Sequence, residues 1–280
     1  MLLRKRIELV VIGVLIIGMI GYAVSSTLYS AFRVNSAEQT LNTVVSHQNS
    51  LNVTFGAINS QLVALNSSAA FDSAQALTLV DKSIASSQLA MNTINRDDAS
   101  LRTAADNLNA LPWLTLLGRG SLDGVATRIA HARKALAAAR AIASDEMLDG
   151  RFWSVLYGGL ADFTTLNTQS SAGDVAGARS TLVKMKAEID QAAQLSGAPG
   201  LPADLHDLMA DIQTFVGDYG NKLDAQAAGD DVAESTAETN VDTDVTEIGK
   251  YDIDKIGGEI DSFYKPMIDR FNSEIAAATA

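Results

Sequence analysis

The stretch LNTVVSHQNSLNVTFGAINSQLVAL, residues 41–65, decides the fold of this chain. Apolar residues recur in it at alternating spacings of three and four, which is the heptad pattern of a helix that packs against another helix. The pattern breaks at residues 66–68 and resumes over residues 77–108. Two long helices joined by a short turn predict an antiparallel hairpin. The predicted inward positions are Leu41, Val44, Gln48, Leu51, Phe55, Ile58, Leu62 and Leu65 in the first helix, and Leu77, Val80, Ile84, Ser87, Met91, Ile94, Asp98, Leu101, Ala105 and Leu108 in the second.

Shorter helices are expected after this hairpin. The composition favours helix over sheet, because Ala and Leu are abundant while only 4 prolines and 6% aromatic residues occur. We therefore predict an all-α fold, in which a long hairpin at residues 30–110 precedes a bundle of helices at residues 121–280 with an acidic C-terminal part. Helical patterns cover residues 121–148, 152–166, 175–195, 202–223 and 241–275, and Pro266 is expected to kink or interrupt the last.

An apolar run near the N-terminus predicts a membrane anchor. Residues 9–29 carry no charge and form roughly 30 Å of helix, which is enough to cross a bilayer. Arg4, Lys5 and Arg6 precede the run, and positive charge marks the cytoplasmic side of a span. We expect a single-pass signal-anchor helix at residues 9–29, with residues 1–8 cytoplasmic and the C-terminal domain extracytoplasmic. The alternative is a signal peptide that is cleaved near Ser25.

Residues 7–12, Ile-Glu-Leu-Val-Val-Ile, resemble the start of the type IV pilin helix, in which a glutamate leads an apolar run. The resemblance covers less than a tenth of the chain. Leu3 stands where the pilin processing glycine would be, and residues 4–6 would place three positive charges inside the mature helix. We therefore assign the chain to no family.

The lengths of the two long helices predict a second membrane contact. Helices at residues 29–67 and 72–110 are each roughly 55–60 Å long, so the chain returns to the outer membrane surface at residues 111–120. Pro112 ends the second helix there, and the residues around it suit an interfacial foot. The alternative is a buried loop that plugs the end of the bundle. The candidate membrane contacts are Trp113, Leu114, Leu116, Leu117 and Arg119.

The composition argues against several classes of function. The absence of cysteine excludes disulfides and thiolate chemistry, and the three histidines are far apart in sequence. Acidic pairs at residues 240–244 and 252–257 lack the ligand spacing of an EF-hand. A formal net charge of −12 disfavours nucleic acid as a partner, because phosphates require a basic face. No nucleophile elbow or phosphate-binding loop occurs, so we expect no enzymatic activity, cofactor or metal.

Two hypotheses on function follow. The first is a membrane-anchored structural scaffold or protein-interaction module of the cell envelope, whose partners are the lipid bilayer and other envelope proteins. The alternative is a sensor-like ligand-binding helical bundle that signals through a partner protein. A sensor requires a pocket, and the bulky residues Phe152, Trp153, Tyr157 and Phe163 are the candidates to form either that pocket or the core.

Overall fold

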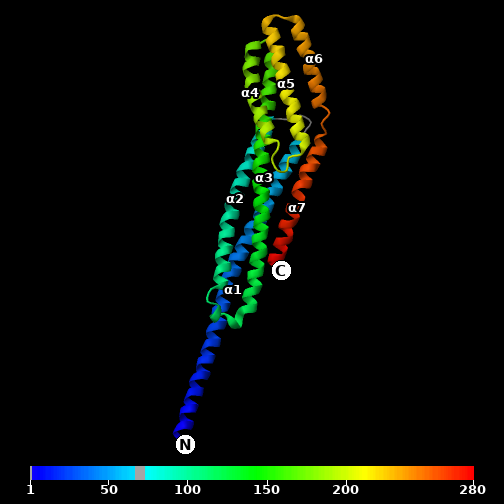
Figure 1. Ribbon diagram of the computed structural model, residues 1–280. Coiled ribbons are helices and arrows are strands. Elements are labelled where there is room, and N and C mark those ends of the chain that lie inside the picture. Colours follow the sequence, from blue (N-terminus) through cyan, green and yellow to red (C-terminus); the bar gives the residue numbers. More distant parts are fainter. Residues whose placement is uncertain (1, 67–72) are drawn as a thin grey trace. The chain divides into compact units, whose positions relative to one another are not determined.

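The computed structural model describes the backbone of residues 2–66 and 73–280, and the side chains of residues 19–53, 56–57 and 73–280. All regular elements in these residues are helical, so the predicted all-α class is confirmed (Figure 1). The α-helices are α1 (Leu2–Asn66), α2 (Ser73–Asn109), α3 (Arg119–Ser171), α4 (Val175–Leu195), α5 (Ala203–Ala228), α6 (Asp231–Ile248) and α7 (Ile253–Thr279), and the 3₁₀ turns are η1 (Pro112–Leu114) and η2 (Leu116–Gly118).

The helices assemble into two units. Unit 1 comprises Met1–Leu51, Asn92–Ala139 and Asp269–Ala280, whereas unit 2 comprises Asn52–Met91 and Arg140–Ile268. α1, α2, α3 and α7 therefore each contribute one segment to both units. Each unit buries an apolar core of its own, as expected of helices that carry an apolar stripe on one face.

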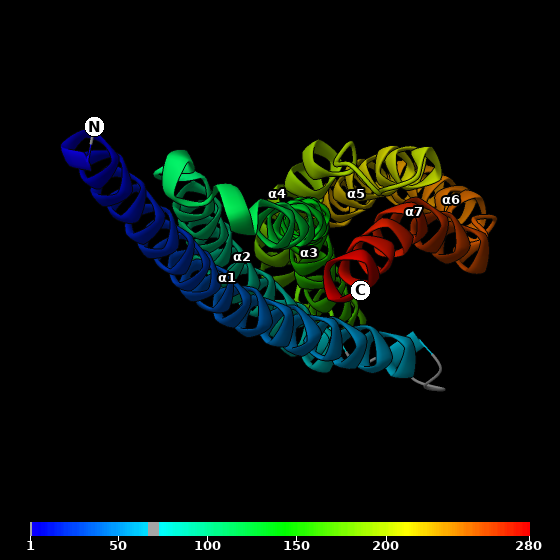
Figure 2. The same ribbon diagram turned by 90° about the horizontal axis from the view of Figure 1, so that it is seen from below.

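In unit 1, α1 and α2 lie side by side in both views (Figures 1 and 2). They are antiparallel, because Arg33 of α1 contacts Asn107 of α2 whereas the later residue His47 contacts the earlier Asp97. Apolar side chains at heptad spacing close the space between the helices of this unit. The buried ones include Leu41, Val44, Ile94, Leu101, Leu108, Ile129, Leu136 and Phe271.

The other two segments of unit 1 are held to this pair by polar contacts as well as by packing. Gln48, which occupies a predicted inward position, is fully buried and donates from Nε2 to the Ala132 carbonyl of α3 at 3.2 Å. Arg128 of α3 donates from Nε to the Ala278 carbonyl of α7 at 2.9 Å. This hydrogen bond satisfies the amide nitrogen of Gln48, whereas its buried Oε1 has no hydrogen-bond partner.

The buried stripe of α2 differs from the predicted one at every second position. Residues 80, 87, 94, 101 and 108 are buried as predicted, but the intervening series lies one residue earlier than expected. Small side chains permit a close approach between helices, and the larger neighbours then flank the contact half-buried. The structure buries Ala76, Ser83, Ala90, Asp97 and Ala104 in place of Leu77, Ile84, Met91, Asp98 and Ala105. The predicted positions Phe55, Ile58, Leu62 and Leu65 of α1 lie outside the residues whose side chains are described.

Unit 2 has the larger aromatic core. α4, α5 and α6 pack as consecutive antiparallel helices, and the turns that precede α4 and α6 follow one local rule. Gly173 and Gly229 adopt left-handed backbone conformations, and the next residues, Asp174 and Asp230, cap α4 and α6 through their side chains. The core is built mainly from Phe152, Leu156, Leu166, Leu182, Met185, Ile189, Leu205, Met209, Ile212, Phe215, Val216, Tyr219 and Leu223.

Two predicted helix breaks do not occur. The expected break at residues 149–151 lies inside the continuous helix α3, because Gly150 allows a close approach of Ile84 rather than ending the helix. A Cβ atom at Gly150 would lie 2.6 Å from Ile84 Cγ1. Pro266 does not interrupt α7, which continues through it to Thr279. Proline removes one backbone hydrogen bond, and the packing on either side of it maintains the helix.

The predicted span at residues 9–29 lies half outside the described side chains, which begin at residue 19. The backbone of this region is helical, as part of α1. Within the described residues, no helix contains a stretch that is both long and apolar enough to cross a membrane. The span therefore stays a prediction from the sequence.

Candidate functional site

The segment between α2 and α3, residues 111–118, forms a compact turn that we call the foot. Leu111 has a positive φ of 49°, a strained conformation for a leucine, and Pro112 then begins the 3₁₀ turn η1. Thr115 separates η1 from η2 and is buried, with its hydroxyl donating to the Pro112 carbonyl at 3.2 Å. The foot is thus a defined structure whose polar backbone groups are partly satisfied internally.

The foot turns its large apolar side chains outward. Trp113, Leu116 and Leu117 are 58–60% exposed, Leu114 is half-buried and Arg119 is exposed. A loop that plugs the end of a bundle would bury these side chains, whereas in unit 1 Trp113, Leu116 and Leu117 are exposed. Membrane contact by these residues stays a prediction, and the structure shows only that their side chains are available for contact.

The foot packs against the N-terminal half of α1. The Tyr22 hydroxyl donates a hydrogen bond to the Trp113 carbonyl. At the other end of the foot, a Cβ atom added to Gly118 would overlap the Ser30 side chain. Ser26 and Ser30 are buried and small, which allows this close approach. The foot therefore lies along α1 between Tyr22 and Ser30.

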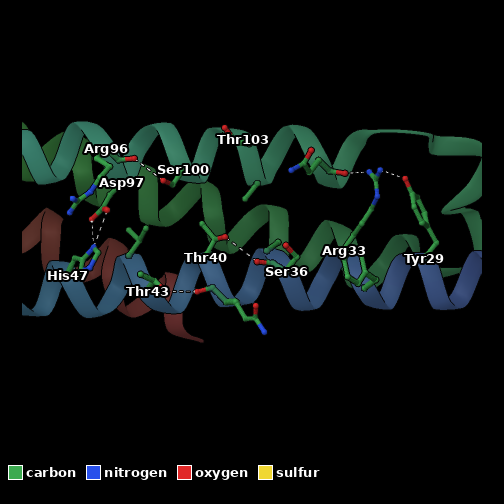
Figure 3. Close-up of a pocket in the computed structure, with 16 residues that line it drawn as sticks. Tyr29, Arg33, Ser36, Thr40, Thr43, His47, Arg96, Asp97, Ser100 and Thr103 are labelled. Carbon is green, nitrogen blue, oxygen red and sulfur yellow. Dashed lines mark hydrogen bonds and ion pairs between the residues drawn. The ribbon is translucent and has the colours of Figure 1, made fainter.

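A polar groove lies beyond the foot, between α1 and α2 of unit 1 (Figure 3). Its volume is about 830 Å³. Four hydroxyls in it donate to their own helices, among them Thr40 to the Ser36 carbonyl and Ser100 to the Arg96 carbonyl. Thr43 and Thr103 do the same with Gln39 and Ala99. These hydroxyls therefore present acceptor lone pairs, but no free O–H group, to a ligand.

Charged side chains close both ends of the groove (Figure 3). At one end, the Arg33 guanidinium donates to the carbonyls of Asn107 and Ala110, the latter at 2.9 Å, and also to the Tyr29 hydroxyl. It thereby satisfies carbonyls at the C-terminal end of α2. At the other end, His47 Nδ1 lies 3.1 Å from both carboxylate oxygens of the buried Asp97.

The four aromatic residues predicted to form a pocket or core lie in unit 2. Phe152 is 0% exposed and meets Trp153 edge to face, with 4.9 Å between ring centroids. Trp153 contacts Tyr157, and Phe163 contacts Phe215 of α5 at 5.5 Å. Neither the polar groove nor a smaller hollow at residues 198–202 is lined by any of these four residues. Their contacts are those of a packed core.

Unit 2 contains a buried carboxyl, Asp149, and a half-buried one, Glu146, that no pattern in the sequence predicts. Asp149 of α3 is only 7% exposed, and it accepts a hydrogen bond from the Tyr264 hydroxyl of α7 through Oδ2, while its Oδ1 has no hydrogen-bond partner. Burial raises the pKa of Asp149 to about 6 and that of Glu146 to about 7. Burial and the Asp149 carboxylate also raise the pKa of Tyr264. No motif indicated this group, since it joins distant helices.

Among the described residues, no group of three or more histidine, aspartate or glutamate side chains is arranged to hold a metal ion. Comparison of the chain with protein-family models, with curated proteins and with solved structures finds no match.

Proposed function

We propose that this chain is a membrane-anchored extracytoplasmic helical scaffold, or protein-interaction module, of the cell envelope. In this role, residues 9–29 of α1 hold the chain in the bilayer, and the foot makes a second contact with the membrane. The packed helices then present their surfaces to other envelope proteins. The proposal joins the sequence-based anchor to the exposed apolar side chains of unit 1.

The row of exposed apolar residues on α1 carries this proposal. Ile20, Val24, Leu28 and Phe32 follow one another at four-residue spacing, and each is 52–71% exposed. Residues four apart lie on the same face of a helix, so these side chains form one continuous apolar stripe. The stripe extends the uncharged sequence at residues 9–18 in the same helix. Monomers in water rarely expose such a stripe, whereas a helix that enters lipid requires one.

The sensor alternative is weaker on two observations. The aromatic residues that it needs as a pocket are packed against each other and against α5. Four hydroxyls of the polar groove donate to their own helices, and the Arg33 guanidinium donates to backbone carbonyls. A specific small-molecule site normally offers several uncommitted polar groups that converge on one ligand. We therefore favour the scaffold.

Single-cysteine labelling tests the topology, because the natural chain contains no cysteine. Thr243 is exposed on α6, so Thr243→Cys should react with a membrane-impermeant maleimide on intact spheroplasts. The matched control Leu2→Cys should react only after lysis. Labelling of both positions, or of neither, before lysis would contradict the proposed orientation.

Crosslinking in native membranes tests the scaffold role. Short amine-to-carboxyl crosslinkers, followed by mass spectrometry, should join surface lysines such as Lys184 to defined envelope proteins. A chain that remains anchored but is crosslinked only to itself would argue against a scaffold. Alkaline extraction of the same membranes measures anchoring separately, so the two parts of the proposal can fail independently.

A further inference from the structure

Two exposed apolar surfaces of unit 1 come from distant parts of the sequence and lie next to each other. One is the α1 segment from Met19 to Phe32, and the other is the foot. The hydrogen bond from Tyr22 to the Trp113 carbonyl and the packing of Gly118 on Ser30 join them. The exposed side chains of this joint surface are Met19, Ile20, Val24, Leu28, Phe32, Leu111, Trp113, Leu116 and Leu117.

We propose that this joint surface, which we call the collar, is seated in the outer leaflet of the bilayer, where lipid acyl chains cover the foot and the adjoining face of α1. The inference rests on the proposed membrane anchor and gives it a depth and a second attachment. The collar partner is thus a phospholipid surface, with acyl chains against the leucines and headgroups against the arginines.

The position of the collar along α1 fixes its depth. Twenty residues span roughly 30 Å of hydrocarbon, and counted from Leu9, the first residue of the uncharged run, they end near residue 28. Tyr22 then lies about 9 Å inside the hydrocarbon edge, and Ser30 about 3 Å outside it. The foot, which contacts both residues, therefore straddles the edge. Interfacial protein segments typically insert by about 5–10 Å.

The polar groups of the collar occur at the levels that this depth requires. Arg33 lies about 8 Å beyond the hydrocarbon edge, among the headgroups. Arg119 follows Gly118, which packs against Ser30, and is exposed at a similar level. Tyr22 and Trp113 lie at the inner end, and aromatic residues with one polar group are typical of this boundary. Charged groups outside and aromatic groups at the edge favour lipid as the partner.

The attachment of the foot to α1 explains why the collar keeps its shape. Ser26 and Ser30 lie on the buried face of α1, and the apolar row at residues 20, 24, 28 and 32 lies on its exposed face. Gly118 fits against Ser30 because it has no side chain. A larger residue at position 118 must displace the foot from α1, which offers a way to perturb the collar without changing an exposed side chain.

Depth-dependent quenching of Trp113 tests the collar. The chain has two tryptophans, so full-length Trp153→Phe retains Trp113 alone, and full-length Trp113→Phe retains Trp153, which packs half-buried against the core of unit 2, as the control. Both variants are reconstituted in phosphatidylcholine vesicles whose acyl chains carry bromine near the carbonyl end or near the terminal methyl. Trp113 should lose about half its emission to the shallow bromine and less to the deep one, as an interfacial tryptophan does. Trp153 should lose none.

Two results would overturn the collar. Trp113 emission could be insensitive to both brominated lipids and quenched by aqueous acrylamide, which places the foot in water. Alternatively, Trp113 could be shielded from lipid and acrylamide while chemical crosslinking captures dimers, which makes the collar an interface between two copies of the chain. Alkaline extraction of the same vesicles shows separately whether the protein stays in the membrane through the helix at residues 9–29.

Gly118→Val provides a second and independent test. Displacement of the foot should change the quenching of Trp113 by the shallow bromine. The expected change is at least as large as the difference in quenching between the two brominated lipids in the parent chain. Circular dichroism checks that the helical content of the full chain is maintained. Ser121→Val, at an exposed position three residues later, is the matched control and should leave the quenching unchanged. Equal quenching in the Gly118 variant and the parent would refute the docking of the foot against α1.

Discussion

The collar of unit 1 and the carboxyls of Asp149 and Glu146 in unit 2 are opposite exceptions to the usual burial of apolar side chains and exposure of charged ones. The collar exposes Trp113 and its apolar neighbours, whereas unit 2 buries Asp149 with one unpartnered oxygen. Exposed apolar surface is costly in water but neutral in lipid, and a buried carboxyl is costly when ionised but much less so when protonated. Each region is therefore suited to a particular condition, the collar to a membrane and the carboxyls to acidic pH.

Removal of a core ring should have the largest effect on stability. Phe152→Ala in unit 2 deletes a fully buried ring, and such truncations cost about 3–5 kcal/mol. In detergent, urea titration followed by circular dichroism should show a lower unfolding midpoint. Trp113→Ala is the matched comparison, because exposed positions change stability by at most about 0.5 kcal/mol. Similar losses in both variants would abolish the distinction between a packed core and an exposed foot.

Displacement of the foot should have an intermediate effect. Gly118→Val forces a branched side chain against Ser30, and overpacking of this kind costs about 1–3 kcal/mol. Limited proteolysis in detergent should cleave near residues 111–118 faster than in the parent chain. Gly124→Val, where nothing lies within 4 Å of an added Cβ, serves as the control. An unaltered cleavage rate would show that Gly118 does not hold the foot in place.

The buried carboxyls should make unit 2 more stable in acid. The folded-state pKa values of Asp149 and Glu146 are raised, to about 6 and about 7, so the folded chain binds more protons than the unfolded chain between about pH 4 and pH 7. The free energy of unfolding should therefore fall as pH rises through this window and level off above it.

Urea titrations at pH 5 and pH 7.5, read from Trp153 in the Trp113→Phe background, measure this dependence. The double variant Glu146→Gln/Asp149→Asn should reduce it. Asp231→Asn, on the exposed start of α6, is the control and should leave it unchanged. A chain in which the double variant keeps the full pH dependence would show that other groups cause it.

The C-terminal end of α7 should respond to acid in the opposite direction, with the smallest effect. His131 Nδ1 lies 2.6 Å from Glu274 Oε2, and this hydrogen bond lowers the pKa of Glu274. The stabilisation is present at neutral pH and is lost as pH falls through the folded-state pKa. Glu274→Gln should cost about 1 kcal/mol or less at pH 7, as partly exposed ion pairs do. Hydrogen exchange of residues 269–280 measures this effect, and the pair contributes nothing if exchange is unchanged.

The sequence was sufficient for the features that depend on local pattern. Heptad spacing predicted the helices, and Pro112 predicted the end of the second one. It was insufficient where a glycine or a small residue served tertiary packing. The pattern predicts separate helices on either side of residues 149–151, although Gly150 lies within one helix and admits Ile84. The predicted stripe falls one residue after Ala76, Ala90 and Ala104, because Leu77 and Met91 are more hydrophobic. Hydrophobicity alone does not show how closely two helices approach.

For the candidate site, the sequence predicted the location of the foot but not the contacts that hold it. Equal helix lengths indicated where the foot returns along α1, but the Ser30–Gly118 contact that holds it requires the folded arrangement. Asp149 and Tyr264 are 115 residues apart, and no short motif connects them. Asp97 carried no sign of burial either, because its partner His47 is on the other helix. Contacts between distant residues are the part that a single sequence does not reveal.

The contact between Tyr22 and Trp113 has a consequence for biosynthesis. The two residues are 91 positions apart, so at roughly 5–20 residues per second the ribosome makes Trp113 several seconds after Tyr22. During that interval the Ser26–Ser30 face of α1 has no foot to cover it. A chaperone or insertion factor that shields this face would therefore act within a short, defined period, and a translational pause before residue 111 would lengthen it.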